Sequence, residues 1–133
     1  MAIRSSSQGR WIMANASLVI TWGNAIPGRE NQSLELFMGI VQKSTGLQAE
    51  GQIERYSAHL ATSGNTNHFG GAMTIEGEIT QLRDLIHSDW YRDTIIKARH
   101  LVDNLNEVHC VTGDAIQGNI ERVVKARKEL GIT

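Results

Sequence analysis

The sequence of 133 residues contains one cysteine, one proline and few aromatic residues (5%), and it has no long apolar run. The single cysteine, Cys110, cannot form an internal disulfide, which fits a reducing compartment, so we expect a cytoplasmic protein. Apolar stretches such as Leu18-Val19-Ile20 are far shorter than the roughly 20 residues that cross a bilayer. The sequence therefore predicts no membrane partner.

The chain also has no excess of charge. Thirteen Lys and Arg stand against fourteen Asp and Glu, a formal net charge of −1. This balance excludes the strongly basic surface by which nucleic-acid-binding proteins neutralise phosphates. A hydrophobic content of 41% at such low net charge also excludes a disordered chain. The length predicts one domain with one core.

The first residues differ in pattern from the rest. Residues 1–12 lack the apolar stretch of about 7–15 residues found in a secretory signal. We expect residues 1–15 to form a flexible N-terminal tail, either native or an expression remnant, with Met13 as an alternative natural start. Residues 16–133 are expected to form the single domain.

Hydrophobic periodicity and turn residues predict the order strand, helix, strand, strand, helix, strand, helix. A break at His87-Ser88-Asp89 is expected inside the second helix, with Ser88 or Asp89 able to cap its second half. Gly46 suits the end of the first helix, and Gly70-Gly71 indicates a bulge or the tight approach of a helix. In chain order the elements are expected at residues 17–22, 29–45, 50–61, 68–75, 78–103, 107–112 and 115–130.

This β-α-β-β-α-β order is typical of an α+β fold, in which an antiparallel sheet carries two helices on one face. The final helix is an addition. In the order and lengths of its elements the chain resembles the ferredoxin-like dimeric α/β-barrel superfamily. That superfamily includes cofactor-independent antibiotic-biosynthesis-type monooxygenases and stress-responsive barrel proteins. The resemblance implies a dimeric α/β barrel, and with it we expect no tightly bound cofactor.

A two-residue turn at Ser63-Gly64 or Gly64-Asn65 would pair the two middle strands so that His59 and His68 share a face. Arg55, Ser57 and Thr74 join them there, and Ile53, Val19 and Val111 are expected on the same helix-free face. The opposite face, expected to pack under the helices, holds Tyr56, Ala58, Leu60, Phe69, Met73 and Ile75. Packing two helix-free faces together predicts a C2 homodimer.

His59 and His68 are the candidate catalytic residues, because a neutral imidazole can act as a base or a ligand near neutral pH. The alternative is that both make ordinary hydrogen bonds at a surface or interface. Neither HxH nor HExxH spacing occurs, so the sequence predicts no metal site.

The resemblance also implies a substrate cavity between sheet and helices, in which polar and aromatic side chains orient an acidic aromatic molecule. The candidate ligand-binding residues are Trp22, Asn24, Trp90, Tyr91 and Arg99. The alternative for Trp22 and Trp90 is plain core packing, as is usual for large apolar side chains.

Two functions remain open: a homodimer that binds or transforms a small organic molecule in this cavity, or a noncatalytic binding or regulatory homodimer. An RNA-binding sheet would display two or three exposed aromatic residues, and none is expected on the helix-free face. The last helix has a basic strip formed by Arg122, Lys125, Arg127 and Lys128, opposite an apolar strip. That apolar strip must cover either its own sheet or that of a partner.

Overall fold

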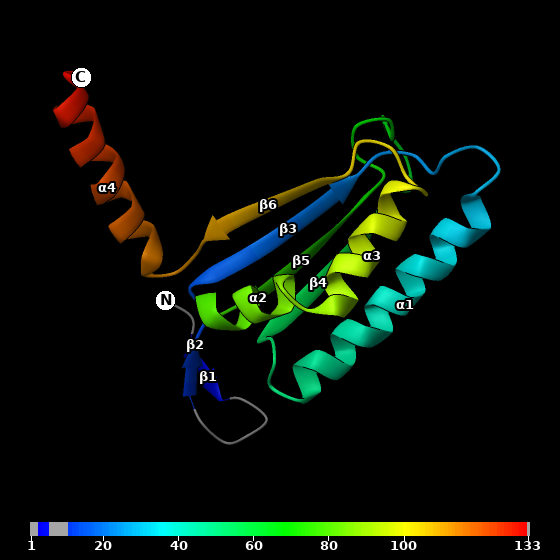
Figure 1. The fold of residues 1–133 in the computed structure, drawn as a ribbon, viewed down its shortest axis with the longest axis horizontal. Helices are drawn as coiled ribbons and strands as arrows, with labels where there is room; N and C mark the ends of the chain where they lie inside the picture. The colour runs from blue at the N-terminus through cyan, green and yellow to red at the C-terminus, as the bar shows by residue number, and fades with distance from the viewer. Residues whose placement is uncertain (1–2, 6–10, 133) are drawn as a thin grey trace.

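The computed structural model describes residues 3–5 and 11–132 of the chain. Within these residues, four helices and six strands follow one another as shown in Figure 1. They are β1 (Ile3–Ser5), β2 (Trp11–Met13), β3 (Ala16–Trp22), α1 (Glu30–Ala49), β4 (Arg55–Leu60), β5 (Gly71–Gly77), α2 (Ile79–Ile86), α3 (Asp89–Arg99), β6 (Asn106–Val111) and α4 (Ala115–Leu130).

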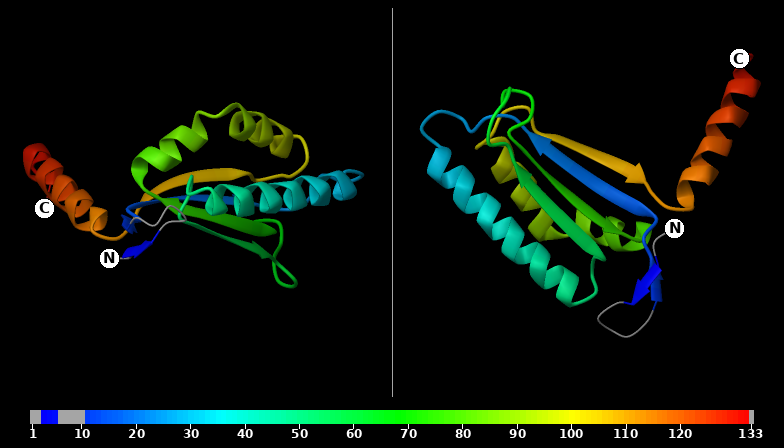
Figure 2. Two further views of the ribbon diagram at one scale, coloured as in Figure 1. Left: turned by 90° about the horizontal axis from the view of Figure 1, so that it is seen from below. Right: turned by 180° about the vertical axis from the view of Figure 1, so that it is seen from behind.

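The main sheet has the strand order β4-β5-β3-β6, and every neighbouring pair is antiparallel. Helices α1, α2 and α3 cover one face of this sheet, and none of the described helices lies on the other face (Figure 2). Helix α4 stands apart at the end of β6. This arrangement confirms the predicted α+β fold with a split β-α-β pattern and an added C-terminal helix.

The core lies between the sheet and the three helices. Register pairs Ile20 with Met73 and Leu18 with Ile75, and all four side chains are buried. They pack against buried side chains from the helices, among them Leu47, Leu82, Leu85 and Ile95. Burying each large aliphatic side chain contributes roughly 1.5–3 kcal/mol, which makes this layer the main source of stability.

The predicted break between α2 and α3 is confirmed. The Ser88 hydroxyl accepts a hydrogen bond from the Tyr91 backbone N–H at 3.2 Å and donates to the Leu85 carbonyl at 2.6 Å. Ser88 therefore ends one helix and caps the next. The last helix also begins and ends where the pattern placed it, with Gly131 in the left-handed conformation just beyond its end (φ 72°).

The end of α1 was predicted too early. The helix continues through Gly46 to Ala49 because Ser44 and Leu47 are buried against the sheet, and tertiary packing outweighs the low helix propensity of glycine. Gly51 follows with a positive φ of 75°. Ile53 is in the core rather than on the helix-free face, and Val111 pairs with Ala16 on the helix side of the sheet.

The two-residue hairpin turn was also wrong. Strand β5 begins only at Gly71, so residues 61–70 form the connection and His68 lies outside the strand. The pairing of Ala58 with Met73 and of Tyr56 with Ile75 nevertheless preserves the predicted faces, because the paired numbers still add to an odd sum. Arg55, Ser57, His59 and Thr74 occupy the helix-free face, as predicted.

Part of the expected N-terminal tail, residues 1–15, has secondary structure. Strands β1 and β2 pair antiparallel, with Ile3 opposite Met13. Ala14 is buried, and the Asn15 backbone N–H donates to the Gly77 carbonyl at 3.1 Å. These contacts join the end of this stretch to the main sheet.

Candidate functional site

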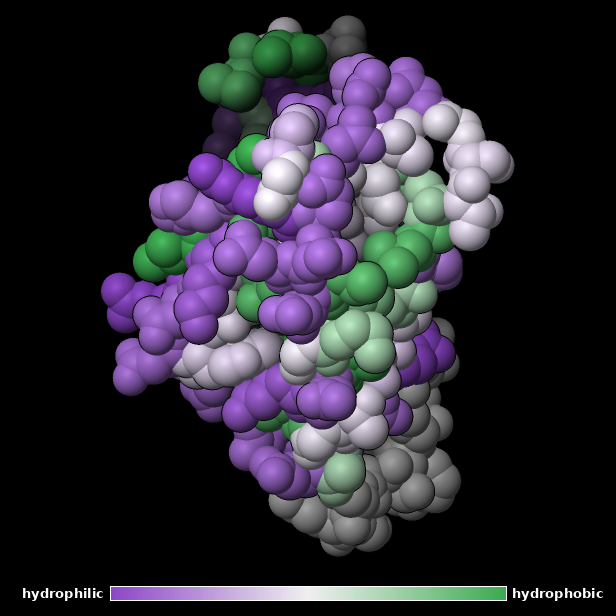
Figure 3. Space-filling model, turned by 90° about the vertical axis from the view of Figure 1, so that its right-hand side faces the viewer, coloured by the Kyte–Doolittle hydropathy of each residue, from purple (hydrophilic) through white to green (hydrophobic). Residues whose placement is uncertain are grey.

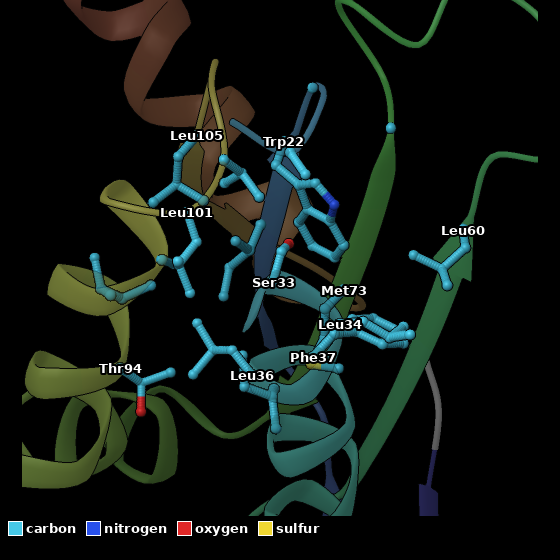
Figure 4. A pocket seen from close by; sticks show the side chains of 18 of the residues that line it. Trp22, Ser33, Leu34, Leu36, Phe37, Leu60, Met73, Thr94, Leu101 and Leu105 are labelled. Carbon is cyan, nitrogen blue, oxygen red and sulfur yellow. The ribbon is translucent and has the colours of Figure 1, made fainter. Parts of the chain in front are cut away.

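A cavity of about 420 Å³ lies between the sheet and helices α1 and α3 (Figure 4). Its walls are largely apolar and come from elements far apart in the sequence. The sheet contributes Ile20, Trp22, Met73 and Ile75, and α1 contributes Leu34, Phe37 and Ile40. Helix α3 contributes Trp90, Tyr91, Thr94 and Ile95, and the connection from α3 to β6 contributes Leu101 and Leu105.

Trp22, the last residue of β3, forms one wall of this cavity. Its ring meets Phe37 of α1 edge to face, with centroids 5.8 Å apart and an interplanar angle of 60°. Edge-to-face pairs of this kind add to the stabilisation from burial alone. Gly71 makes room for the indole, because a Cβ at that position would lie 2.4 Å from the Trp22 ring.

Asn24 joins three loops near the cavity. Its Nδ2 donates to Asn67 Oδ1 at 2.5 Å, and its backbone N–H donates to Asp103 Oδ1 at 2.7 Å. Asn104 Nδ2 donates to the Asn67 carbonyl at 2.7 Å. Because Asn24 also lines the cavity, its amide holds the loop of residues 61–70 over one end of the site.

Glycine is required where that loop meets the end of β3. The Gly70 backbone N–H donates to the Trp22 carbonyl at 2.6 Å. A Cβ on Gly70 would lie only 1.7 Å from the Gly23 carbonyl oxygen. A close approach at Gly70 is therefore present, but the expectation of a helix there is wrong, because the approaching segment is the end of strand β3.

Tyr91 is a buried polar group of the cavity wall, with 5% of its surface exposed. Its hydroxyl donates to Glu107 Oε1 at 2.5 Å, while Arg99 donates to Glu107 Oε2 at 2.8 Å. Burial raises the pKa of Tyr91 well above its usual value, and the hydrogen bond to Glu107 and its negative charge raise it further. Tyr91 therefore stays neutral, with its proton committed to Glu107.

The structure brings together four of the five candidate ligand-binding residues. Trp22, Asn24, Trp90 and Tyr91 all line the cavity. Arg99 does not line it, since its guanidinium is engaged with Glu107 and its side chain is 60% exposed.

The two candidate catalytic histidines lie elsewhere. His59 is exposed on β4 opposite Ala72, and His68 is exposed in the loop of residues 61–70. Neither lines the cavity. Within residues 3–5 and 11–132, no three His, Cys, Asp or Glu side chains come close enough to hold a metal ion.

Sequence reasoning missed Glu107, the partner of Tyr91. The sequence contains part of the signal, because Glu107 and Val108 are neighbours in a predicted strand and so face opposite sides of the sheet. The structure pairs Glu107 with Ile20, which places it on the helix side. An acidic residue on a helix-covered face requires a partner. The partner, Tyr91, could not be identified from the sequence, because it lies on helix α3 and reaches Glu107 on strand β6 only in the folded structure.

A second cavity of about 440 Å³ lies between α1 and α2 and shares Trp90 with the first. Its polar lining includes Lys43, Gln52 and Asp84. The Lys43 ammonium lies 5.5 Å from the centre of the Trp90 ring, within the range of a cation–π interaction. Trp90 is thus held in place by α1 and separates the apolar cavity from a more polar one.

No protein-family model matches the sequence, and the curated proteins contain no match. Solved structures do match. A dimeric protein of unknown function and ferredoxin-like fold from Bacteroides fragilis superposes with a TM-score of 0.54 at 8% identity, covering 76% of this chain and 99% of that one. The fold is ferredoxin-like.

Other proteins of this fold have enzyme names. A hydroxynitrile lyase from Passiflora edulis matches with a TM-score of 0.55 at 5% identity, covering 75% of this chain and 95% of that one. A protein from Deinococcus radiodurans, provisionally named an antibiotic biosynthesis monooxygenase, matches at 0.53 and 14% identity, covering 77% and 95%. At these identities the likeness is one of fold. Within the described residues, no helix of this ferredoxin-like chain is long and apolar enough to cross a membrane.

Proposed function

We propose that this protein is a homodimer that binds a small, mainly apolar organic molecule in the cavity between α1, α3 and the sheet. The cavity itself is the observation that carries the proposal. Its volume of about 420 Å³ and its apolar walls match the usual form of small-molecule sites, which are roughly 300–1,000 Å³ and mostly hydrophobic with a few polar groups.

The character of the lining supports binding more than acid–base chemistry. Its ionisable side chains are Tyr91 and Glu30, and the Tyr91 proton is committed to Glu107. Glu30 is exposed at the start of α1. The Trp22 and Phe37 rings offer flat apolar surface on which an aromatic or aliphatic body can pack.

The helix-free face of the sheet supports the homodimer. Val19 and Val108 lie opposite each other on this face, and nearly half of the Val108 side chain is exposed. Pairing this face with its copy would remove apolar surface on both subunits from water. The Bacteroides fragilis protein of this fold is itself described as dimeric.

Ligand binding is tested by titrating the protein with anilinonaphthalene sulfonate, benzoate, cinnamate and decanoate, followed by fluorescence and isothermal calorimetry. We expect saturable binding of at least one probe, one molecule per chain. Ala98→Leu, which adds volume to the cavity wall, should weaken that binding by about tenfold or more. Ala49→Leu, on the exposed last turn of α1, is the matched control. Folded protein that binds no probe, or binds equally well with Ala98→Leu, would contradict the proposal.

The homodimer is tested separately by size-exclusion chromatography with light scattering. Val108→Glu should shift the protein to monomer, because it places a charge on the sheet face that forms the proposed interface. Ile96→Glu makes the same change on the exposed outer side of α3 and should leave the dimer intact. A monomer at every concentration of the unchanged protein would overturn this part of the proposal.

A further inference from the structure

Helix α4 has an apolar strip that no described part of the chain covers. Among the helices that the structure describes, α4 alone buries no side chain. Ile120, Val123 and Val124 are each nearly half exposed, and α4 extends beyond the sheet, clear of α1 and α3 (Figures 1 and 2). An isolated helix of this length is only marginally stable in water, so this strip calls for a packing partner.

The same chain has a second uncovered apolar surface beside the cavity. Leu34, Met38 and Leu60 are exposed by 54%, 52% and 49%. Leu34 and Leu60 line the cavity, and Met38 lies one helical turn beyond Leu34 on α1. We refer to these three residues as the cavity rim. Figure 3 shows apolar surface interrupting the hydrophilic surface on this side of the molecule.

The two surfaces carry opposite charge. Helix α4 holds four basic residues, Arg122, Lys125, Arg127 and Lys128, against two acidic ones, a net charge of +2. The part of α1 that carries the rim, residues 30–42, holds Glu30 and Glu35 and no basic residue, a net charge of −2. Apolar strips flanked by complementary charge favour one orientation of docking over others.

We propose that α4 of each subunit packs across the cavity rim of the other, so that each ligand site is completed by its partner. The proposal rests on the homodimer proposed above. Strands β4 and β6 are the two edges of the sheet. When two sheets pack face to face about a two-fold axis parallel to their strands, β6 of one subunit lies over β4 of the other. Helix α4 then starts beside the partner's β4, the strand that carries the rim residue Leu60.

The length of α4 fits this placement. Register puts the end of β6 at the same end of the sheet as Arg55, the first residue of β4. Leu60 lies five residues further along, about 17 Å away in a strand. In the proposed dimer, α4 turns from the direction across the strands seen in Figure 1 to lie along the partner's β4. Sixteen helical residues span about 24 Å, so the second half of α4 then reaches the rim. Val124 then lies near the partner's Met38, and Arg127 and Lys128 lie near the partner's Glu30 and Glu35.

Disulfide trapping tests this arrangement directly, without any ligand. Two differently tagged full-length chains, both with Cys110→Ser, are mixed: one carries Met38→Cys and the other Val124→Cys. Under mild oxidation we expect a cross-linked heterodimer as the main product. Ile96→Cys, equally exposed on the outer side of α3, replaces Met38→Cys as the matched control and should give little product.

Cross-linking of the Val124→Cys chain to itself would show α4 packing on α4 and would overturn the proposal. Lack of a specific product, while light scattering still shows a dimer and the probe still binds, would overturn it and leave the proposed function standing. A dimer that traps as expected but binds no probe would instead contradict the ligand-binding function alone.

A charge-reversal pair gives a second readout in solution. Glu35→Lys and Lys128→Glu should each raise the dissociation constant of the bound probe several-fold, by loosening the helix over the rim. In the double variant, the increase in the logarithm of the probe's dissociation constant should be at most half of the sum of the two single-variant increases. Losses that simply add would show that the two charges do not meet and would overturn the proposed contact.

Discussion

The hydroxyl of Tyr91 donates a hydrogen bond to Glu107 across the gap between α3 and the sheet, with 2.5 Å between the two oxygens. Tyr91 is buried, whereas Arg99, the other partner of Glu107, is largely exposed. The two contacts to one carboxylate should therefore differ in their energetic importance.

Tyr91→Phe should lower the free energy of unfolding by about 1.5–3 kcal/mol, the range for a hydrogen bond to a charged group. Arg99→Gln should cost about 1 kcal/mol or less, because exposed ion pairs are weak. Urea unfolding of both variants measures the difference. Equal losses would show that the buried hydrogen bond has no special weight.

The raised pKa of Tyr91 predicts a loss of stability in alkali. Because the folded protein holds this proton more tightly than the unfolded chain, its contribution is fully present below the ordinary tyrosine pKa of 10.0. Above that pH the unfolded chain releases the proton first, and stability falls by up to about 1.4 kcal/mol per pH unit for this group. Tyr91→Phe should remove that component of the slope.

Urea unfolding between pH 9 and 11, an interval of about one unit on either side of the ordinary tyrosine pKa, checks this expectation. Tyr56→Phe is the control, since it removes the other tyrosine and keeps the Tyr91–Glu107 contact. If the free energy of unfolding of Tyr91→Phe fell with pH as steeply as that of the unchanged protein, Tyr91 would not be the source of the alkaline loss of stability.

Gly70→Ala should destabilise the fold by about 3 kcal/mol or more, because its Cβ would collide with the Gly23 carbonyl oxygen and backbone must move. Gly46→Ala, inside α1 and free of neighbouring atoms around the added Cβ, should instead stabilise by about 0.5–1 kcal/mol. The melting temperatures of the two variants should move in opposite directions. A fall in both would show that the effect is not specific to the steric clash at Gly70.

Asn67→Ala removes the side-chain acceptor that Asn24 uses to hold the loop of residues 61–70. We expect faster amide hydrogen exchange in that loop and about tenfold weaker probe binding, with little change in the core. Thr62→Ala, in the same loop, is the control. Unchanged exchange would show that the loop is held by its backbone contacts alone.

His59→Ala and His68→Ala should leave probe binding unchanged, because neither residue lines the cavity. Calorimetric titration of both variants measures this. A marked loss in either would place a histidine in the site and would favour a reaction over simple binding.

The order of elements from β3 to α4, the break at Ser88, the limits of α4 and the faces of the middle strands could be predicted from the sequence, whereas β1 and β2 could not. Each depends on local signals: the period of apolar residues, a capping serine, a terminal glycine, and the alternation of side chains along a strand. Such signals depend on residues close together in the sequence, so they can be recognised without knowing how distant parts of the chain pack.

Tertiary packing decided the remainder. Burial of Leu47 extends α1 past Gly46. The Gly70 backbone N–H donates to the Trp22 carbonyl just before β5 begins at Gly71, and His68 lies outside the strand. The hydrogen bond between Tyr91 and Glu107 joins residues sixteen apart, and the walls of the cavity come from residues spread between Ile20 and Leu105. Burial and steric fit depend on which surfaces meet in space, and no local pattern of residues encodes that meeting.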